Sequence, residues 1–261
     1  MKSVATVTYV QMTSQTECKR RLEWNGMKVT DQATRLRGRE QPQPRRFVIN
    51  RLPRDDDELW WTVQALWGYK FPRARVCANH CSPFEAFADA YFARSPVAIW
   101  KASRGFGGKS RTLGVLGLTE MALLGAEVSV LGGSGAQSPN VHATSQEAWG
   151  WYNAPKALLI SAPTKFDTFL RNGGHMRTLM ASQTSVRGPH PQRLRLDEID
   201  EMDLAILEGA QGQPMRKMGP HGRIETHTVM SSTHQYPDKT MTAMLARAKE
   251  KGWPIFEWCW R

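Results

Sequence analysis

The sequence predicts an α/β protein with a mostly parallel central sheet that is covered by helices on both faces. Expected strands at residues 97–100, 127–131, 193–198 and 225–231 alternate with stretches of helical periodicity, and the first two of these strands are apolar. The first of these segments also runs directly into a glycine-rich turn, and a further apolar periodic stretch follows that turn. Strands that alternate with helices form parallel sheets with both faces buried.

The chain has 261 residues and a mass of 29.5 kDa, enough for one substantial core and a small additional segment. Its net charge of +11 is uneven, because residues 1–54 carry 12 Lys and Arg against 4 Asp and Glu. We expect residues 1–75 to form a basic lead-in that is helical or irregular. Such a segment suits a polyanion, and a solvated arm that keeps the protein soluble is an equally good interpretation.

Two helices are expected before the first core strand. The acidic run at residues 55–58 precedes a helix through Trp60, Trp61 and Trp67. An aromatic stripe at helical spacing then extends over residues 83–92, and core packing explains it best. We expect the core of the fold to cover residues 76–251.

The middle of the chain predicts a strand, a helix and a hairpin. Strand 127–131 ends at a Gly-Gly-Ser-Gly turn, and residues 143–151 have the spacing of a returning helix. Segments 167–170 and 175–180 flank Asn-Gly-Gly at residues 172–174, whose tolerance of positive φ suits a hairpin turn.

The last third of the chain continues the alternation. Residues 193–198 form a short strand that ends in two acids, residues 225–231 form another strand, and residues 239–251 have helical spacing. Residues 252–261 are expected to begin a linker.

Cysteine usage indicates a reduced, cytosolic, soluble protein, because four scattered cysteines come without a leader or an apolar run of about 18 residues. Cys77 and Cys81 flank His80, but no second ligand pair follows them at zinc-finger spacing. Buried or inert thiols are therefore the preferred interpretation.

Residues 97–110 have the pattern of a strand that enters a phosphate-binding loop. Glycines let consecutive backbone N–H groups turn toward an anion, Lys109 would reach the β- and γ-phosphates, and the Ser110 hydroxyl would bind Mg²⁺. The helix that follows adds the positive end of its dipole. The loop departs from the consensus at Ser103, where the pattern has glycine. The expected nucleotide-binding residues of this segment are Ser103, Arg104, Gly105, Phe106, Gly107, Gly108, Lys109, Ser110 and Arg111.

A second motif lies 88 residues beyond Lys109, where a strand ends in Asp197 and Glu198. This order fits the additional-strand (ASCE, RecA-like) class of P-loop NTPases. Asp197 would hold Mg²⁺. Glu198 would orient and deprotonate the attacking water, a role worth about 10²- to 10⁴-fold in rate.

Arg104 is a second candidate catalytic residue, because a guanidinium inside the loop would neutralise the γ-phosphate. A structural arginine that braces the loop is the alternative. We expect Asp200, Glu201 and Asp203 to cap the next helix rather than to bind a metal.

With these residues in place, the chain resembles the ATPase half of the large terminase subunit of tailed bacteriophages. The resemblance runs from about Cys81 to the C-terminus. It is carried by the loop at residues 103–110, the segment 185–198, the triplet 231–233 and the closing phrase 252–259.

The resemblance implies ATP and Mg²⁺ as cofactors, with Lys109 and Ser110 on phosphate and metal. It implies further that Asp197 supports the metal and that Glu198 is the catalytic carboxylate.

Two more sets of residues take roles from the resemblance alone. Ser231, Ser232 and Thr233 would form a motif that couples the γ-phosphate to the DNA-gripping surface, although a Ser/Thr cluster is otherwise an N-cap. Phe84 and Glu85 occupy the place of the adenine-contacting motif, where the family often has glutamine.

The resemblance also implies the biological setting. It describes an ATPase motor that drives double-stranded DNA into a procapsid, in the cytoplasm of an infected bacterial host. The motor would act as a ring of copies with a portal protein and a terminase small subunit. The nuclease domain of this family has no room after Lys251, so no DNA cleavage is expected.

Two other functions fit parts of the sequence. One is the ATPase lobe of a superfamily 2-like nucleic-acid helicase or translocase, which shares the Asp-Glu strand end and a Ser/Thr triplet. The other is a non-catalytic DNA-binding module with a degenerate nucleotide site, which Ser103 and the basic N-terminal region would explain.

Overall fold

The structure is a computed structural model that describes most of the chain beyond residue 50. The described residues are 6–10, 29–30, 45–48, 51–103, 108–133, 138–151, 153–180, 182 and 188–259. They fall into two compact units. The smaller comprises Met1–Lys70 with Ala148–Leu158, and the larger comprises Phe71–Glu147 with Leu159–Arg261. The domain boundaries expected from the sequence remain a prediction.

The described residues of the smaller unit include a short antiparallel sheet and one complete α-helix. Strands β1 (Thr6–Val10), β3 (Arg45–Val48) and β2 (Val29–Thr30) lie in that order in the sheet. The sequence pattern did not predict these strands, although β1 is a run of Thr, Val and Tyr, the residue types that favour strands.

The helix of the smaller unit is α2 (Asp56–Trp67), which has signals at both ends. The side chain of Asp55 accepts a hydrogen bond from the Glu58 amide at the N-cap, and Gly68 ends the helix with a φ of 67°. The first turn is acidic, as the helix dipole favours. The helix predicted through the tryptophans is therefore confirmed.

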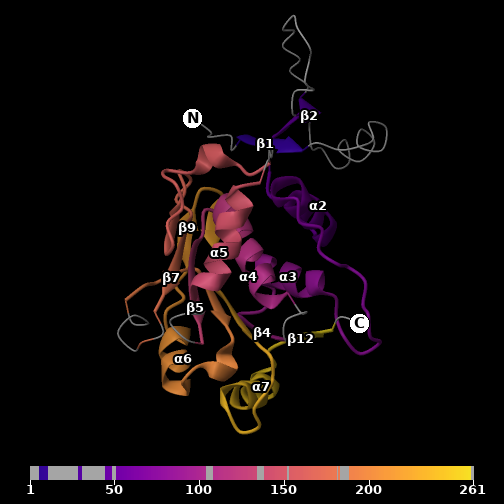
Figure 1. Cartoon of the computed structure of the whole chain (residues 1–261), viewed down its shortest axis with the longest axis vertical. Helices are drawn as coiled ribbons and strands as arrows, with labels where there is room; N and C mark the ends of the chain where they lie inside the picture. The colour runs from indigo at the N-terminus through magenta and orange to yellow at the C-terminus, as the bar shows by residue number, and fades with distance from the viewer. Residues whose placement is uncertain are drawn as a thin grey trace, which may run out of the picture. The chain divides into compact units, whose positions relative to one another are not determined.

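The larger unit is built on a seven-stranded sheet with the strand order β12-β4-β11-β8-β5-β7-β6. Figure 1 labels four of these strands, β4, β5, β7 and β12. All neighbouring strands are parallel except β6, which pairs antiparallel with β7. The strands are β4 (Val97–Ala102), β5 (Glu127–Gly132), β6 (Asp167–Phe169), β7 (His175–Leu179), β8 (Arg193–Asp197), β11 (His227–Ser232) and β12 (Ile255–Trp258). A separate hairpin pairs β9 (Lys217–Gly219) with β10 (Gly222–Ile224).

Helices connect these strands. They are α3 (Pro83–Phe92), α4 (Lys109–Thr119) with a π-helical continuation η2 (Glu120–Leu124), α5 (Ser138–Trp149), α6 (Leu204–Gln211) and α7 (Thr240–Lys251). Short 3₁₀ turns lie at η3 (Lys156–Leu158) and η4 (Ile199–Glu201). Every core strand and helix predicted from residue 83 onward is present, with ends that differ by a few residues.

One face of the sheet packs on α6, α7 and η4 through a buried apolar cluster. The cluster contains Ile99, Leu131, Leu179, Leu194, Leu196, Ile199, Met202, Leu207, Ala210, Met230, Met241, Met244 and Ala248. Because strand side chains alternate between faces, Leu194 and Leu196 of β8 face this cluster while Arg193, Arg195 and Asp197 face the other way.

The opposite face is covered by α3 and α4 (Figure 1). It contains a buried ion cluster, in which the Glu120 carboxylate contacts both Arg193 and Arg195. The Arg193 guanidinium also donates to the carbonyl oxygens of Ala90 and Tyr91 at 3.2 and 3.1 Å. These bonds tie β8 to α3 and to the end of α4, and β8 is the strand that ends in Asp197.

No helix among the described residues has the length and apolar character needed to span a membrane.

Candidate functional site

The site lies at the carboxyl end of the sheet, where β4 leads toward the N-terminus of α4. Gly108 directly precedes α4 and adopts a φ of 60°, a left-handed conformation that glycine reaches without steric cost. Residues Arg104, Gly105, Phe106 and Gly107 lie outside the described residues, so the expected roles of the loop interior, including that of Arg104, stay predictions.

Lys109 is the first residue of α4, and its side chain is buried. Its ammonium donates to the Thr233 hydroxyl at 3.0 Å and to the carbonyl oxygen of Ala102 at 3.3 Å. The Glu198 carboxylate lies 3.7 Å away. The lysine is thus held at the strand end by groups from β4 and from the segments after β8 and β11.

Ser110 and Asp197 are in direct contact, because the Ser110 hydroxyl donates to Oδ2 of the carboxylate. Asp197 is 3% exposed, and its other oxygen, Oδ1, is buried and makes no hydrogen bond of good geometry with the described residues, although the Ser231 hydroxyl is near enough to lower the pKa of this carboxyl. Burial raises the pKa of Asp197 to about 6, and the charge of Glu198 adds to the increase.

These features fit a divalent cation. A buried carboxylate oxygen without a partner costs free energy, and a hydroxyl beside a carboxylate offers the oxygen ligands that Mg²⁺ prefers. Ser110 and Asp197 therefore form a donor set that suits the predicted Mg²⁺.

Glu198 follows the strand in a strained backbone conformation, with a φ of 52°. A glutamate rarely adopts this left-handed region, and such strain occurs where the surroundings hold a residue in place for function. The Glu198 carboxylate accepts a hydrogen bond from the Ser232 hydroxyl at 3.4 Å. Glu198 keeps 25% of its side chain exposed, so solvent reaches it.

The triplet at the end of β11 meets both motifs. Ser232 contacts Glu198, and Thr233 contacts Lys109. Ser231 pairs in register with Asp197 on β8, and its buried hydroxyl lies near enough to the Asp197 carboxyl to lower the pKa of that group. The triplet is not a helix N-cap, because the N-cap residue of the helix that follows is Lys239.

The two motifs and the triplet therefore converge, as the sequence analysis expects. β11 lies between the loop strand β4 and the acid strand β8, and this is the additional strand of the predicted class. The predicted fold class, a P-loop NTPase fold of the additional-strand type, is confirmed.

Comparison with solved structures finds similar folds at low sequence identity. The chain aligns with the large terminase of bacteriophage HK97 with a TM-score of 0.54 and 15% identity, over 76% of this chain and 44% of that chain. Two structures of the large terminase of a thermophilic bacteriophage, one in complex with ADP, align with a TM-score of 0.47. Their identities are 11% and 12%, over 64% of this chain and 41% and 40% of theirs.

This chain shares its fold with part of the HK97 large terminase. It spans less than half the length of these terminase chains. No family model matches the sequence, and no curated protein matches it significantly. The resemblance to large terminases noted in the sequence is confirmed at the level of the fold, and function follows from sites rather than from a fold.

Phe84 and Glu85, the two residues expected to contact adenine, both make contacts with other side chains of the fold. Phe84 is buried in α3 and stacks against Phe87, with ring centroids 5.9 Å apart. Glu85 completes a capping box with Ser82 and pairs with Arg75 at 3.0 Å. Their proposed role in adenine binding stays a prediction.

Three other residues to which the sequence assigns a role lie at the surface. Arg111 lies on an exposed part of α4, 4.0 Å from Glu147. Ser103 is exposed directly after β4. Asp203 caps α6 by accepting from the Ala205 and Ile206 amides, which confirms the expected capping role for this acid.

Asp200 holds two segments of the site together, whereas its place in the sequence predicted that it would cap the next helix. It is buried, and its carboxylate accepts from the backbone amides of Gln235, Tyr236 and Met241. Its own amide donates to Ser232. Asp200 therefore joins the segment after Glu198 to the segment after the Ser/Thr triplet. Only the parallel pairing of β8 and β11 makes these two segments neighbours.

Proposed function

We propose that this chain is the ATPase domain of a viral DNA-packaging motor, a terminase large subunit that hydrolyses ATP to move double-stranded DNA into a procapsid. One observation carries the proposal. Lys109 and Ser110 at the start of α4 lie against Asp197 and Glu198, and 88 residues separate Lys109 from Asp197. Groups that suit phosphate binding and water activation thereby gather around one point.

Lys109 and the N-terminus of α4 would bind the phosphates. The helix presents its first backbone N–H groups and the positive end of its dipole to an anion. Lys109 donates to Ala102 and Thr233 at the start of α4, and its ammonium would turn from these oxygens to a β- or γ-phosphate. The burial of this cation favours an anionic partner.

Ser110 and Asp197 would hold Mg²⁺. The cation, when bound, neutralises charge on the β- and γ-phosphate oxygens. The serine hydroxyl, which donates to Asp197 in this structure, would turn its oxygen lone pair toward the cation instead.

Glu198 would act as the general base for the attacking water. Its carboxylate is partly exposed, and Ser232 and Lys109 fix its position. A base in hydrogen-bond reach of water accepts its proton as the oxygen attacks phosphorus. Because Ser232 and Thr233 contact Glu198 and Lys109, the triplet would respond when the γ-phosphate leaves.

Partners follow from this proposal. Double-stranded DNA is the substrate of the movement, and the basic N-terminal segment suits a polyanion. A ring of copies, a portal protein and a small subunit would complete the motor.

The test measures phosphate release and nucleotide binding separately. Glu198→Gln keeps the shape of the side chain and removes the base, so turnover should fall by about 10²- to 10⁴-fold while binding of a fluorescent ATP analogue persists. Lys109→Ala should lose both. Glu201→Gln, which alters an exposed acid three residues away, is the matched control and should keep both.

Three outcomes contradict the proposal. Turnover of Glu198→Gln equal to that of Glu201→Gln removes the assigned base. Phosphate release by the unaltered chain that does not exceed that of Lys109→Ala favours the non-catalytic DNA-binding module. ATP-driven strand displacement by the chain alone would instead favour a helicase lobe.

A further inference from the structure

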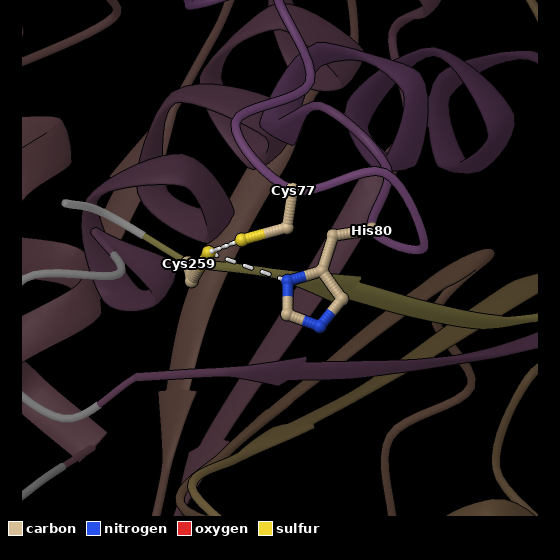
Figure 2. Close-up of side chains that lie close together, drawn as sticks. All are labelled: Cys77, His80 and Cys259. Carbon is tan, nitrogen blue, oxygen red and sulfur yellow. Dashed lines mark hydrogen bonds between the residues drawn. The ribbon is translucent and has the colours of Figure 1, made fainter.

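Three potential metal ligands that are far apart in the sequence meet beside the edge strand β12. Cys77 and His80 lie on the loop before α3, and Cys259 directly follows β12. The two sulfur atoms are 2.7 Å apart, and Nδ1 of His80 lies 3.3 Å from the sulfur of Cys259 (Figure 2). One ligand atom from each residue lies within 4.8 Å of the others.

Backbone pairing brings these residues together. The His80 amide donates to the carbonyl oxygen of Cys77 at 3.1 Å, so the loop turns and presents both side chains on one side. The Cys81 amide then donates to the carbonyl oxygen of Glu257 in β12 at 2.8 Å. This bond docks the loop on the strand two residues before Cys259.

The donor set matches the chemistry of zinc. Two cysteine sulfurs and one imidazole nitrogen are ligands that Zn²⁺ binds in tetrahedral sites. Nδ1 of His80 faces the sulfurs, while its other ring nitrogen lies 3.6 Å from the carboxylate of Glu257. The same carboxylate oxygen accepts from Lys101 at 2.9 Å, so Glu257 lies behind the ring as a nearby anion rather than as its hydrogen-bond acceptor.

The distance between the two sulfur atoms differs by only about 1 Å from that in a zinc site. Tetrahedral bonds of about 2.3 Å from zinc to sulfur place two sulfurs about 3.7 Å apart. Rotation of the two half-buried cysteine side chains would open the present sulfur separation by that difference of about 1 Å.

We propose that Cys77, His80 and Cys259 bind one Zn²⁺ ion, with a fourth position for water or another ligand. The bound ion would fasten β12 to the loop before α3 and close a span of 182 residues. Cross-links over long spans remove the most freedom from the unfolded chain. The site is separate from the proposed magnesium site, and it does not depend on the proposed ATPase function.

Cys81 provides a matched control within the same loop. Its thiol donates to the carbonyl oxygen of Glu257 at 3.2 Å, and it does not belong to the group of three ligand atoms formed by Cys77, His80 and Cys259. Replacing Cys81 therefore removes a neighbouring sulfur without removing a proposed ligand.

The experiment determines the metal content of the full chain, purified in a reducing buffer, by plasma mass spectrometry. The unaltered chain and Cys81→Ser should each carry about one zinc per chain. Cys77→Ser and Cys259→Ser should fall at least about tenfold below that value. Equal zinc in Cys259→Ser and Cys81→Ser, or none in the unaltered chain after zinc is supplied, overturns the proposal.

A second measurement on the unaltered chain covers the case in which a variant does not fold. Cobalt(II) added to the apoprotein should produce thiolate-to-metal charge-transfer absorption and the intense visible bands of a tetrahedral site, and zinc should abolish both. Cobalt spectra without thiolate bands overturn the proposal. A Cys77–Cys259 disulfide that persists under reducing conditions, detected by peptide mass spectrometry, also overturns it.

Discussion

The buried ion cluster of Glu120, Arg193 and Arg195 predicts that Glu120→Gln strongly lowers the stability of the protein. Glu120 and Arg195 are fully buried and Arg193 is 3% exposed, so one carboxylate balances two guanidinium groups. Burial lowers the pKa of Arg195 to about 10, and the arginine remains charged at neutral pH. The substitution keeps the shape of the side chain but leaves both cations without the anion that they share.

The expected cost is large because the desolvated charges lose their partner. Removing one member of a buried ion pair costs about 3–5 kcal/mol. At an m-value of about 3 kcal/mol per molar urea, the midpoint of unfolding should fall by about 1 to 1.7 M. Loss of secondary structure, followed by circular dichroism in urea, measures the shift.

Glu208→Gln is the matched control, because Glu208 pairs with Arg247 at 2.8 Å on the surface. An exposed pair contributes at most about 1 kcal/mol. If the two variants shift the midpoint equally, the ion cluster does not hold β8 as described, and the position of Asp197 must depend on other contacts.

Three further predictions concern stability. A Cβ at Gly174 would lie 2.3 Å from the backbone oxygen of Met121, so Gly174→Ala should cost about 1–3 kcal/mol in thermal unfolding. Gly188→Ala should cost little, because no atom of the described residues lies within 4 Å of a Cβ there. Burial lowers the pKa of His227 well below its ordinary value of 6.5, so the unfolded state binds the extra proton and stability is lost as the pH falls below 6.5. The slope should exceed that of His227→Gln by about 1.4 kcal/mol per pH unit in urea titrations, and identical slopes would contradict the assignment. Asn tolerates the left-handed backbone of residue 198, so the urea midpoint of Glu198→Asn should be at least as high as that of Glu198→Gln. Neither variant should hydrolyse ATP. A lower midpoint for the Asn variant would argue against backbone strain at this residue.

The sequence predicted the parts of the site that depend on local chemistry. The pattern predicts a strand, a loop and a helix in that order, because it consists of an apolar run, a glycine-rich turn and a stretch of helical periodicity. Asp197 also follows from local pattern, because it sits two residues beyond Arg195 and therefore on the same face of β8. Register with the neighbouring strand then places it beside Ser231.

Other contacts depend on which strands become neighbours, and local pattern carries no information about that. The contacts of Glu120 with Arg195 and of Cys77 with Cys259 join residues 75 and 182 positions apart. Asp200 resembles a helix cap in sequence, yet it faces the segment after β11 because β8 and β11 pair. The short strands β1, β2 and β3 also escaped prediction, because two to five residues give too little periodicity.

By itself, the sequence determined which residue types stand at the ends of β4, β8 and β11, since backbone preference and side-chain alternation act over a few residues. Only the tertiary structure decided that these ends meet, that two arginines share one buried carboxylate, and that a cysteine after the last strand joins a loop near the start of the core. The physical reason is that strand order is set by the burial of whole faces of the sheet, a property of the complete fold.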